Sequence, residues 1–192
     1  MVSIAIIDTV GLVYDGDTLK KRGLGGSESA VILLSRELAR LGIKVTVFNN
    51  CQDSTSRPGV YDGVTYNPFS IDLVETYDMV ISSRTTTPFS NLEQYNSYYN
   101  VPYSFEFAQK IKNSTNYRVL WLHDTFCIGD QYLEDMVMDG TIQELFTLSD
   151  FHTTYITNCD HGKRRNFEVL KNKVFQTRNG VNLYKDWVDV RQ

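Results

Sequence analysis

The stretch GLGGSESAVILLSRELARLGIKVTVFNN, residues 23–50, decides the fold of this 192-residue chain. Its apolar residues recur at intervals of three, four and three, which predicts a helix over residues 27–41; they are Val31, Leu34, Leu38 and Leu41. Gly42 is a natural stop for that helix, and residues 43–50 are typical of a buried strand. Because the apolar run at 2–7 predicts an earlier strand, the first third is strand, helix, strand. That unit requires a parallel sheet and a right-handed crossover.

Further strands are indicated downstream of this unit. They are expected at 59–68 (a hairpin with Asp62-Gly63 as its turn), 77–83, 118–124 and 172–180, the last ending in an Asn-Gly turn. Residues 142–156 predict a short strand and then a helix with Ser149 as its N-cap. The Tyr- and Asn-rich segment 91–103 has no assignable pattern. We therefore expect an α/β fold: a single Rossmann-like domain with an open, mostly parallel sheet and helices on both faces.

Composition limits the class of function. The chain is 42% hydrophobic and 22% charged, and it contains no apolar run long enough to span a bilayer. Its first residues lack the pattern of a signal peptide, and its net charge of −4 argues against a nucleic-acid partner. Three widely spaced cysteines indicate neither a disulfide framework nor a metal site, which favours a reducing, cytoplasmic setting.

The glycine loop before the first helix does not fit a dinucleotide fingerprint. Glu28 stands where the third glycine belongs, some fifteen residues separate the first strand from the loop, and the second strand ends in Asn49-Asn50 rather than an acidic residue. A Walker A motif fails as well, because no Gly-Lys-Ser/Thr follows. What remains is a helix start at Gly25 and Gly26 that either favours an anion or is simply a tight entry to the helix.

Four stretches together resemble the N-terminal domain of retaining glycosyltransferases of the GT-B fold, the group that includes glycogen-synthase-like and lipopolysaccharide enzymes. The first is the glycine loop with its helix and strand. The others are VLWLHDT (119–125), FTLSDFHTTYI (146–156) and VFQTRNGVNL (174–183), and the four cover nearly the whole chain in the family's order.

The resemblance implies a metal-independent transfer of sugar from a nucleotide-sugar to a glycan or lipid-linked acceptor, with no cofactor and at most peripheral membrane contact. Gly25 and Gly26 would contact the donor phosphate, and His123 would touch sugar or acceptor. Asp124 would orient His123 or bind an acceptor hydroxyl. Glu28 and Arg84, at or near the carboxyl ends of strands, would bind acceptor.

The chain departs from the family after the Asn-Gly turn. Residues 1–181 correspond to the N-terminal domain, 182–192 are a tail or the start of an interdomain connection, and the donor-binding domain is absent. Full activity would therefore need a second domain or partner chain. The alternatives are a noncatalytic glycan- or lipid-carrier-binding module and, with less support, an NAD(P)-binding protein.

Several single residues have a plain structural interpretation. A histidine at a strand end is by itself more often structural than catalytic. We expect Trp121 in the core, and His152 and His161 at the surface. The tyrosines of 91–103 are expected to pack rather than to stack on a glycan; they are Tyr95, Tyr98, Tyr99 and Tyr103.

Overall fold

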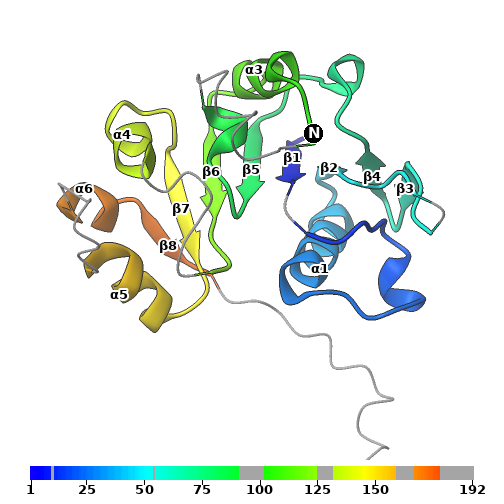
Figure 1. Cartoon of the computed structure of the whole chain (residues 1–192), viewed down its shortest axis with the longest axis horizontal. Coiled ribbons are helices and arrows are strands. Elements are labelled where there is room, and N and C mark those ends of the chain that lie inside the picture. The colour runs from blue at the N-terminus through cyan, green and yellow to red at the C-terminus, as the bar shows by residue number, and fades with distance from the viewer. Residues whose placement is uncertain (10, 54, 91–101, 125–131, 159–166, 178–192) are drawn as a thin grey trace, which may run out of the picture.

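The computed structural model describes residues 1–9, 11–53, 55–90, 102–124, 132–158 and 167–177. They form one eight-stranded sheet in the order β3-β4-β2-β1-β5-β6-β7-β8 (Figure 1). Only the β3–β4 pair is antiparallel, and the other neighbours run parallel. The strands are β1 Ser3–Asp8, β2 Lys44–Asn49, β3 Gly59–Tyr61, β4 Val64–Asn67, β5 Met79–Ser83, β6 Arg118–Trp121, β7 Glu144–Thr147 and β8 Val174–Gln176.

Five α-helices and three short 3-10 turns connect the described strands. The helices are α1 Gly26–Arg40, α3 Phe105–Asn113, α4 Leu133–Met138, α5 Asp150–Asn158 and α6 Phe167–Lys171, and the turns are η1 Thr18–Lys20, η2 Ile71–Leu73 and η3 Thr87–Phe89. None of the helices in the described part of the chain is both long and apolar enough to cross a bilayer.

The core has two halves because alternate strand residues point to opposite faces of the sheet. In β1, Ile4 and Ile6 join the half that contains Val31 of α1. Ala5 and Ile7 join the other half, to which α3, α4, α5 and α6 all contribute apolar side chains. The fold is therefore the expected α/β, Rossmann-like sheet with helices on both faces.

The strand order reverses between β1 and β5. From β1 the chain continues outward to β2 and β4, whereas β5 begins the series that continues to β6, β7 and β8 on the other side. In open α/β sheets, ligands bind beyond the carboxyl ends of the strands at such a topological switch point. The loops that follow β1 and β5 are therefore where a site is expected.

Most predicted elements are confirmed, with shifts of one or two residues at most of their ends; the strand expected at 172–180 is shorter, and β8 ends at Gln176. The β3–β4 hairpin turns at Asp62-Gly63, where both residues have positive φ, at 49° and 81°. Ser149 caps α5, because its Oγ accepts a hydrogen bond from His152 N at 3.1 Å. The strand expected at 118–124 is shorter and ends at Trp121, so His123 lies in the loop beyond it. Most of segment 91–103, the Asn-Gly turn and the tail 182–192 lie outside the described residues.

Candidate functional site

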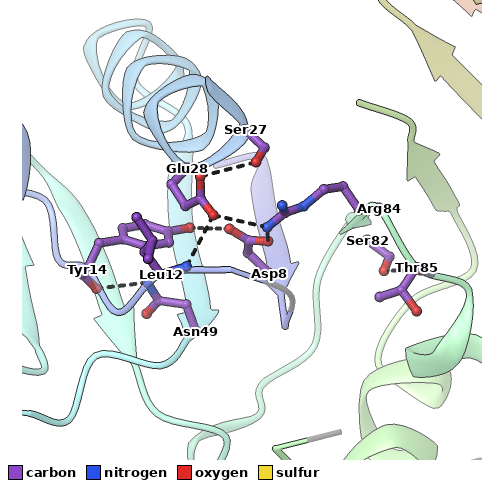
Figure 2. A network of polar contacts seen from close by, with 9 residues as sticks. All are labelled: Asp8, Leu12, Tyr14, Ser27, Glu28, Asn49, Ser82, Arg84 and Thr85. Carbon is purple, nitrogen blue, oxygen red and sulfur yellow. Dashed lines mark hydrogen bonds and ion pairs between the residues drawn. The ribbon is translucent and has the colours of Figure 1, made fainter. Parts of the chain in front are cut away.

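Two carboxylates and one guanidinium meet at the switch point. Asp8 is the last residue of β1, Arg84 follows β5, and Glu28 lies in the first turn of α1. Arg84 Nη2 lies 3.2 Å from Asp8 Oδ1 and 3.3 Å from Glu28 Oε1 (Figure 2). All three side chains are buried or nearly so, with Arg84 at 13% exposure. A single guanidinium nitrogen thus forms ion pairs with two carboxylates at a position that is largely shielded from solvent.

Arg84 holds a backbone conformation that side chains rarely adopt. Its φ is +66°, in the left-handed region, where a non-glycine residue costs about 1 kcal/mol. The Arg84 amide donates a hydrogen bond to Trp121 O at 2.9 Å, which ties the loop after β5 to the end of β6. Backbone strain of this kind is concentrated at functional sites.

Asp8 is held by the long loop that follows β1. The Tyr14 hydroxyl donates a hydrogen bond to Asp8 Oδ2 at 2.8 Å, and the Tyr14 carbonyl accepts one from Asn49 Nδ2 at 2.9 Å. Burial raises the pKa of Asp8 to about 6, against the opposing effects of Arg84 and of the Tyr14 hydrogen bond; the charge of Glu28 raises it further. Asp8 can therefore exchange a proton close to neutral pH.

Glu28 fills the space that two glycines leave open. Its carboxylate accepts hydrogen bonds from Leu12 N at 3.2 Å and from Ser27 Oγ at 3.2 Å. A Cβ on Gly11, whose φ is +139°, would lie 1.9 Å from Glu28 Oε1, and a Cβ on Gly25 would lie 2.3 Å from Oε2. Position 11 thus requires glycine because of its φ, whereas a side chain at position 25 would require the Glu28 carboxylate to move.

His123 lies just beyond β6 with its ring against Trp121, the two centroids 4.3 Å apart. Its Nε2 is buried and has no described hydrogen-bond partner. Burial, with smaller effects from the positive charges of Arg84 and His152, lowers the pKa of His123 to about 3. The imidazole is therefore neutral at pH 7, with one nitrogen that donates and one that accepts.

Polar atoms without partners gather around the same strand ends. Four of the buried side-chain atoms that lack a hydrogen bond to a described residue lie here: Thr9 Oγ1, Arg84 Nε, Trp121 Nε1 and His123 Nε2. They follow or end the neighbouring strands β1, β5 and β6. Leaving a buried donor or acceptor unpaired costs about 1–3 kcal/mol, so each needs an explanation. A polar ligand can supply the missing partners only where the side chains that now cover these atoms move aside, because none of the four is in contact with solvent.

The structure brings several of the sequence candidates together. Glu28 and Arg84 contact each other directly, and Gly25 lies beside the Glu28 carboxylate. Gly26 begins α1, and a Cβ built on it meets no described atom within 4 Å. Asp124 is exposed; burial lowers the pKa of His152, and the backbone and negative charge of Asp124 offset part of that lowering.

One histidine differs from the sequence expectation. His152 is buried at 5% exposure, not at the surface. It occupies the first turn of α5, where its Nδ1 accepts a hydrogen bond from Leu148 N at 3.4 Å, and burial lowers its pKa. His161 lies outside the described residues. The core positions expected for Trp121 and Tyr103 are confirmed, at 4% and 7% exposure.

Two members of the site were missed by sequence reasoning. Asp8 ends the first strand, so its place at a strand's carboxyl end was a usable signal. Tyr14 gave no signal, because it lies in the polar connection after β1 and reaches Asp8 only through the course of that loop. Among the described residues, no group of three His, Cys, Asp or Glu side chains is arranged to hold a metal ion.

Comparisons with known proteins leave the interpretation to the geometry. Searches of protein-family models, of curated proteins and of solved structures each gave no match to this chain.

Proposed function

We propose that this chain is the acceptor-side, N-terminal domain of a retaining GT-B glycosyltransferase. It would transfer a sugar from a nucleotide-sugar to a glycan or lipid-linked acceptor, without a metal and in a cytoplasmic setting. The observation that carries the proposal is the set of unpaired buried polar atoms around Arg84 and His123 at the switch point. A sugar hydroxyl can both donate and accept a hydrogen bond. It can therefore pair with the donors and with the acceptors of this set.

The charges of the site support a hydroxylated ligand. Arg84 offers an unpaired Nε, and its charge is balanced by Asp8 and Glu28, so the site does not present a strong positive field. His123 is neutral at pH 7 and can pair with a hydroxyl in either direction. The Trp121 indole adds a further donor beside it. In this proposal His123 lies closest to the reacting sugar, and Asp124 adds an exposed carboxylate at the rim.

The start of α1 is the proposed contact for the donor diphosphate. Space above Gly26 is open among the described residues, and helix N-termini favour anions. In this proposal a second domain or partner chain would hold most of the donor.

Calorimetric titration of the full chain tests the proposal. Oligosaccharides should bind, and UDP- and GDP-sugars should bind weakly or not at all. Arg84→Gln should weaken oligosaccharide binding about tenfold or more, because it removes a buried charged donor. The matched control is Arg40→Gln, which removes an arginine that is 65% exposed at the far end of α1. Tight NADH binding, or equal oligosaccharide binding by both variants, would contradict the proposal.

A noncatalytic glycan-binding module is the second candidate, and one contact favours it. Glu28 Oε2 lies close enough to Gly25 to overlap a Cβ there, so a diphosphate at this loop would meet a carboxylate. A neutral glycan would not be repelled by that carboxylate. Hydrolysis of a nucleotide-sugar by this chain alone would exclude the noncatalytic candidate.

A further inference from the structure

A cavity of about 380 Å³ lies at the start of strands β6, β7 and β8. It is lined by residues just before or at the start of each strand, among them Tyr117, Gln143, Glu144, Asn172, Lys173 and Phe175. Because these strands run parallel to β1 and β5, their starts lie at the end of the sheet opposite to the switch point. The cavity is therefore separate from the site of Arg84 and His123. Its volume is in the range of small-molecule sites, about 300–1,000 Å³.

The sheet face beside the cavity is open among the described residues. Phe175 pairs in register with Phe146, and their rings are in contact with centroids 5.8 Å apart. Phe146 packs against the half of the core whose described helical side chains all come from α1. That helix packs on β1, β2 and β4, as Figure 1 also shows, while α3, α4, α5 and α6 contribute to the other half. The Phe175 ring is 60% exposed, so it offers an apolar surface to a ligand.

Two groups of opposite charge line the cavity without pairing with each other. Leu145 pairs in register with Val174, and Leu145 N donates a hydrogen bond to Lys173 O at 2.8 Å. Glu144 and Lys173 therefore lie side by side on neighbouring strands. Neither forms an ion pair with any described residue. The ammonium thus keeps its three donors for a partner that enters the cavity.

The Glu144 carboxylate is held in place by Tyr117. The hydrogen bond from the Tyr117 hydroxyl to Glu144, with smaller effects of burial and of the negative charge of Glu144, raises the pKa of Tyr117 to about 12. The phenol therefore remains a donor at neutral pH, and a carboxylate has acceptor positions for more than one such donor. Gln143 has a different role, because its Oε1 accepts from Arg118 N at 2.6 Å and its Nε2 donates to Gly140 O. It forms a wall of the cavity.

We propose that this cavity binds a small zwitterion with an apolar side chain, of the α-amino acid class. The ammonium of the ligand pairs with Glu144, its carboxylate pairs with Lys173 and the Asn172 amide, and its side chain lies on the Phe175 ring. A simple anion or cation would pair with only one of the two charged groups and would face the like charge of the other. A neutral sugar would pair with neither charge. The inference does not rest on the proposed enzymatic function.

Calorimetric titration of the full chain with L-phenylalanine tests the proposal. Binding is expected with a dissociation constant below about 1 mM. 2-Phenylethylamine lacks the carboxylate, 3-phenylpropanoate lacks the ammonium and L-alanine lacks the ring. Each should bind about tenfold more weakly or less, because each loses one of the three contacts. No heat of binding for L-phenylalanine at millimolar concentration, or equal binding of 2-phenylethylamine and L-phenylalanine, would overturn the proposal.

Two substitutions locate the ligand. Glu144→Gln keeps an acceptor for the tyrosine hydroxyl but removes the charge, and Lys173→Met removes an exposed ammonium. Each should weaken L-phenylalanine binding about tenfold. The matched controls are Glu37→Gln, which changes a carboxylate that is 51% exposed on α1, and Lys21→Met, which removes an exposed lysine after η1. Both controls should bind like the wild type, and equal thermal midpoints would show that all four variants fold.

A further variant separates this site from the switch point. Loss of L-phenylalanine binding in Arg84→Gln, with binding kept in Lys173→Met, would put the ligand at the switch point and overturn the proposal. Loss in Lys173→Met with binding kept in Arg84→Gln would support a separate site at the start of β8.

Discussion

Asp8 and His123 should give the stability of this protein opposing pH dependences. The pKa of Asp8 is raised from 3.8 to about 6, so the folded state binds this proton more tightly and stability falls as pH rises through that window. The pKa of His123 is lowered from 6.5 to about 3, so the folded state binds its proton less tightly and stability rises with pH. The two windows overlap between pH 3.8 and about 6.

The two effects have similar size. Integrated from about pH 4.5 to 6.5, each changes the free energy of unfolding by about 2 kcal/mol, Asp8 downward and His123 upward. They therefore nearly cancel in the wild-type chain. In Asp8→Asn only His123 contributes, so the free energy of unfolding should rise by about 2 kcal/mol over this pH range, whereas that of the wild type stays nearly constant. In His123→Gln the carboxyl acts alone, and stability should fall by about the same amount.

Urea unfolding followed by circular dichroism, at several pH values for all three proteins, measures these slopes. Other titrating groups contribute the same background to each protein, so only the differences between the curves count. Parallel curves for the wild type and Asp8→Asn would refute the reasoning for the buried carboxyl. Parallel curves for the wild type and His123→Gln would refute it for the imidazole.

Three further substitutions probe the same region. Gly11→Ala should lower the free energy of unfolding by about 2 kcal/mol or more, since the new methyl overlaps Glu28 Oε1 and φ is +139°; urea unfolding measures it. Gly26→Val should leave the thermal midpoint nearly unchanged, because its Cβ meets no described atom within 4 Å. The same variant should abolish turnover of a completed two-domain enzyme, and unaltered turnover would exclude the phosphate role. His123→Ala should reduce that turnover about a hundredfold, and unchanged kinetics would leave His123 a structural residue.

The parts of the fold that the sequence predicted are those with strong local signals. The first strand, helix and strand have continuous or periodic apolar patterns, and the Asp62-Gly63 turn has its own residue signature. The helices α3, α4 and α6 were missed. The last two are six and five residues long, too short for a periodic pattern to be distinctive. Helix α3 has a usable cap, Ser104, whose Oγ accepts a hydrogen bond from Phe107 N at 3.2 Å.

Within the site, sequence reasoning identified individual residues but not their pairing. Glu28 and Arg84 were placed near strand ends as ligand-binding residues, without any reason to expect them in contact. Their contact depends on the left-handed backbone of Arg84 and on glycine at position 11, which together let one nitrogen reach the carboxylate. These are properties of loop geometry, which periodicity does not encode. His152 was misassigned for a related reason, because a polar first-turn residue can face inward when it also caps the preceding loop.

Because one nitrogen of Arg84 contacts both carboxylates, ligand binding at Arg84 is coupled to protonation of Asp8. An anionic ligand that draws the guanidinium away removes the positive charge from both carboxylates at once. Arg84 holds the pKa of Asp8 down, so its departure raises a pKa that is already about 6. At neutral pH the site would then take up a proton as the anion enters, and the heat of binding would vary with the ionisation enthalpy of the buffer. A neutral sugar would leave that heat independent of the buffer, so proton uptake reports the charge of the ligand.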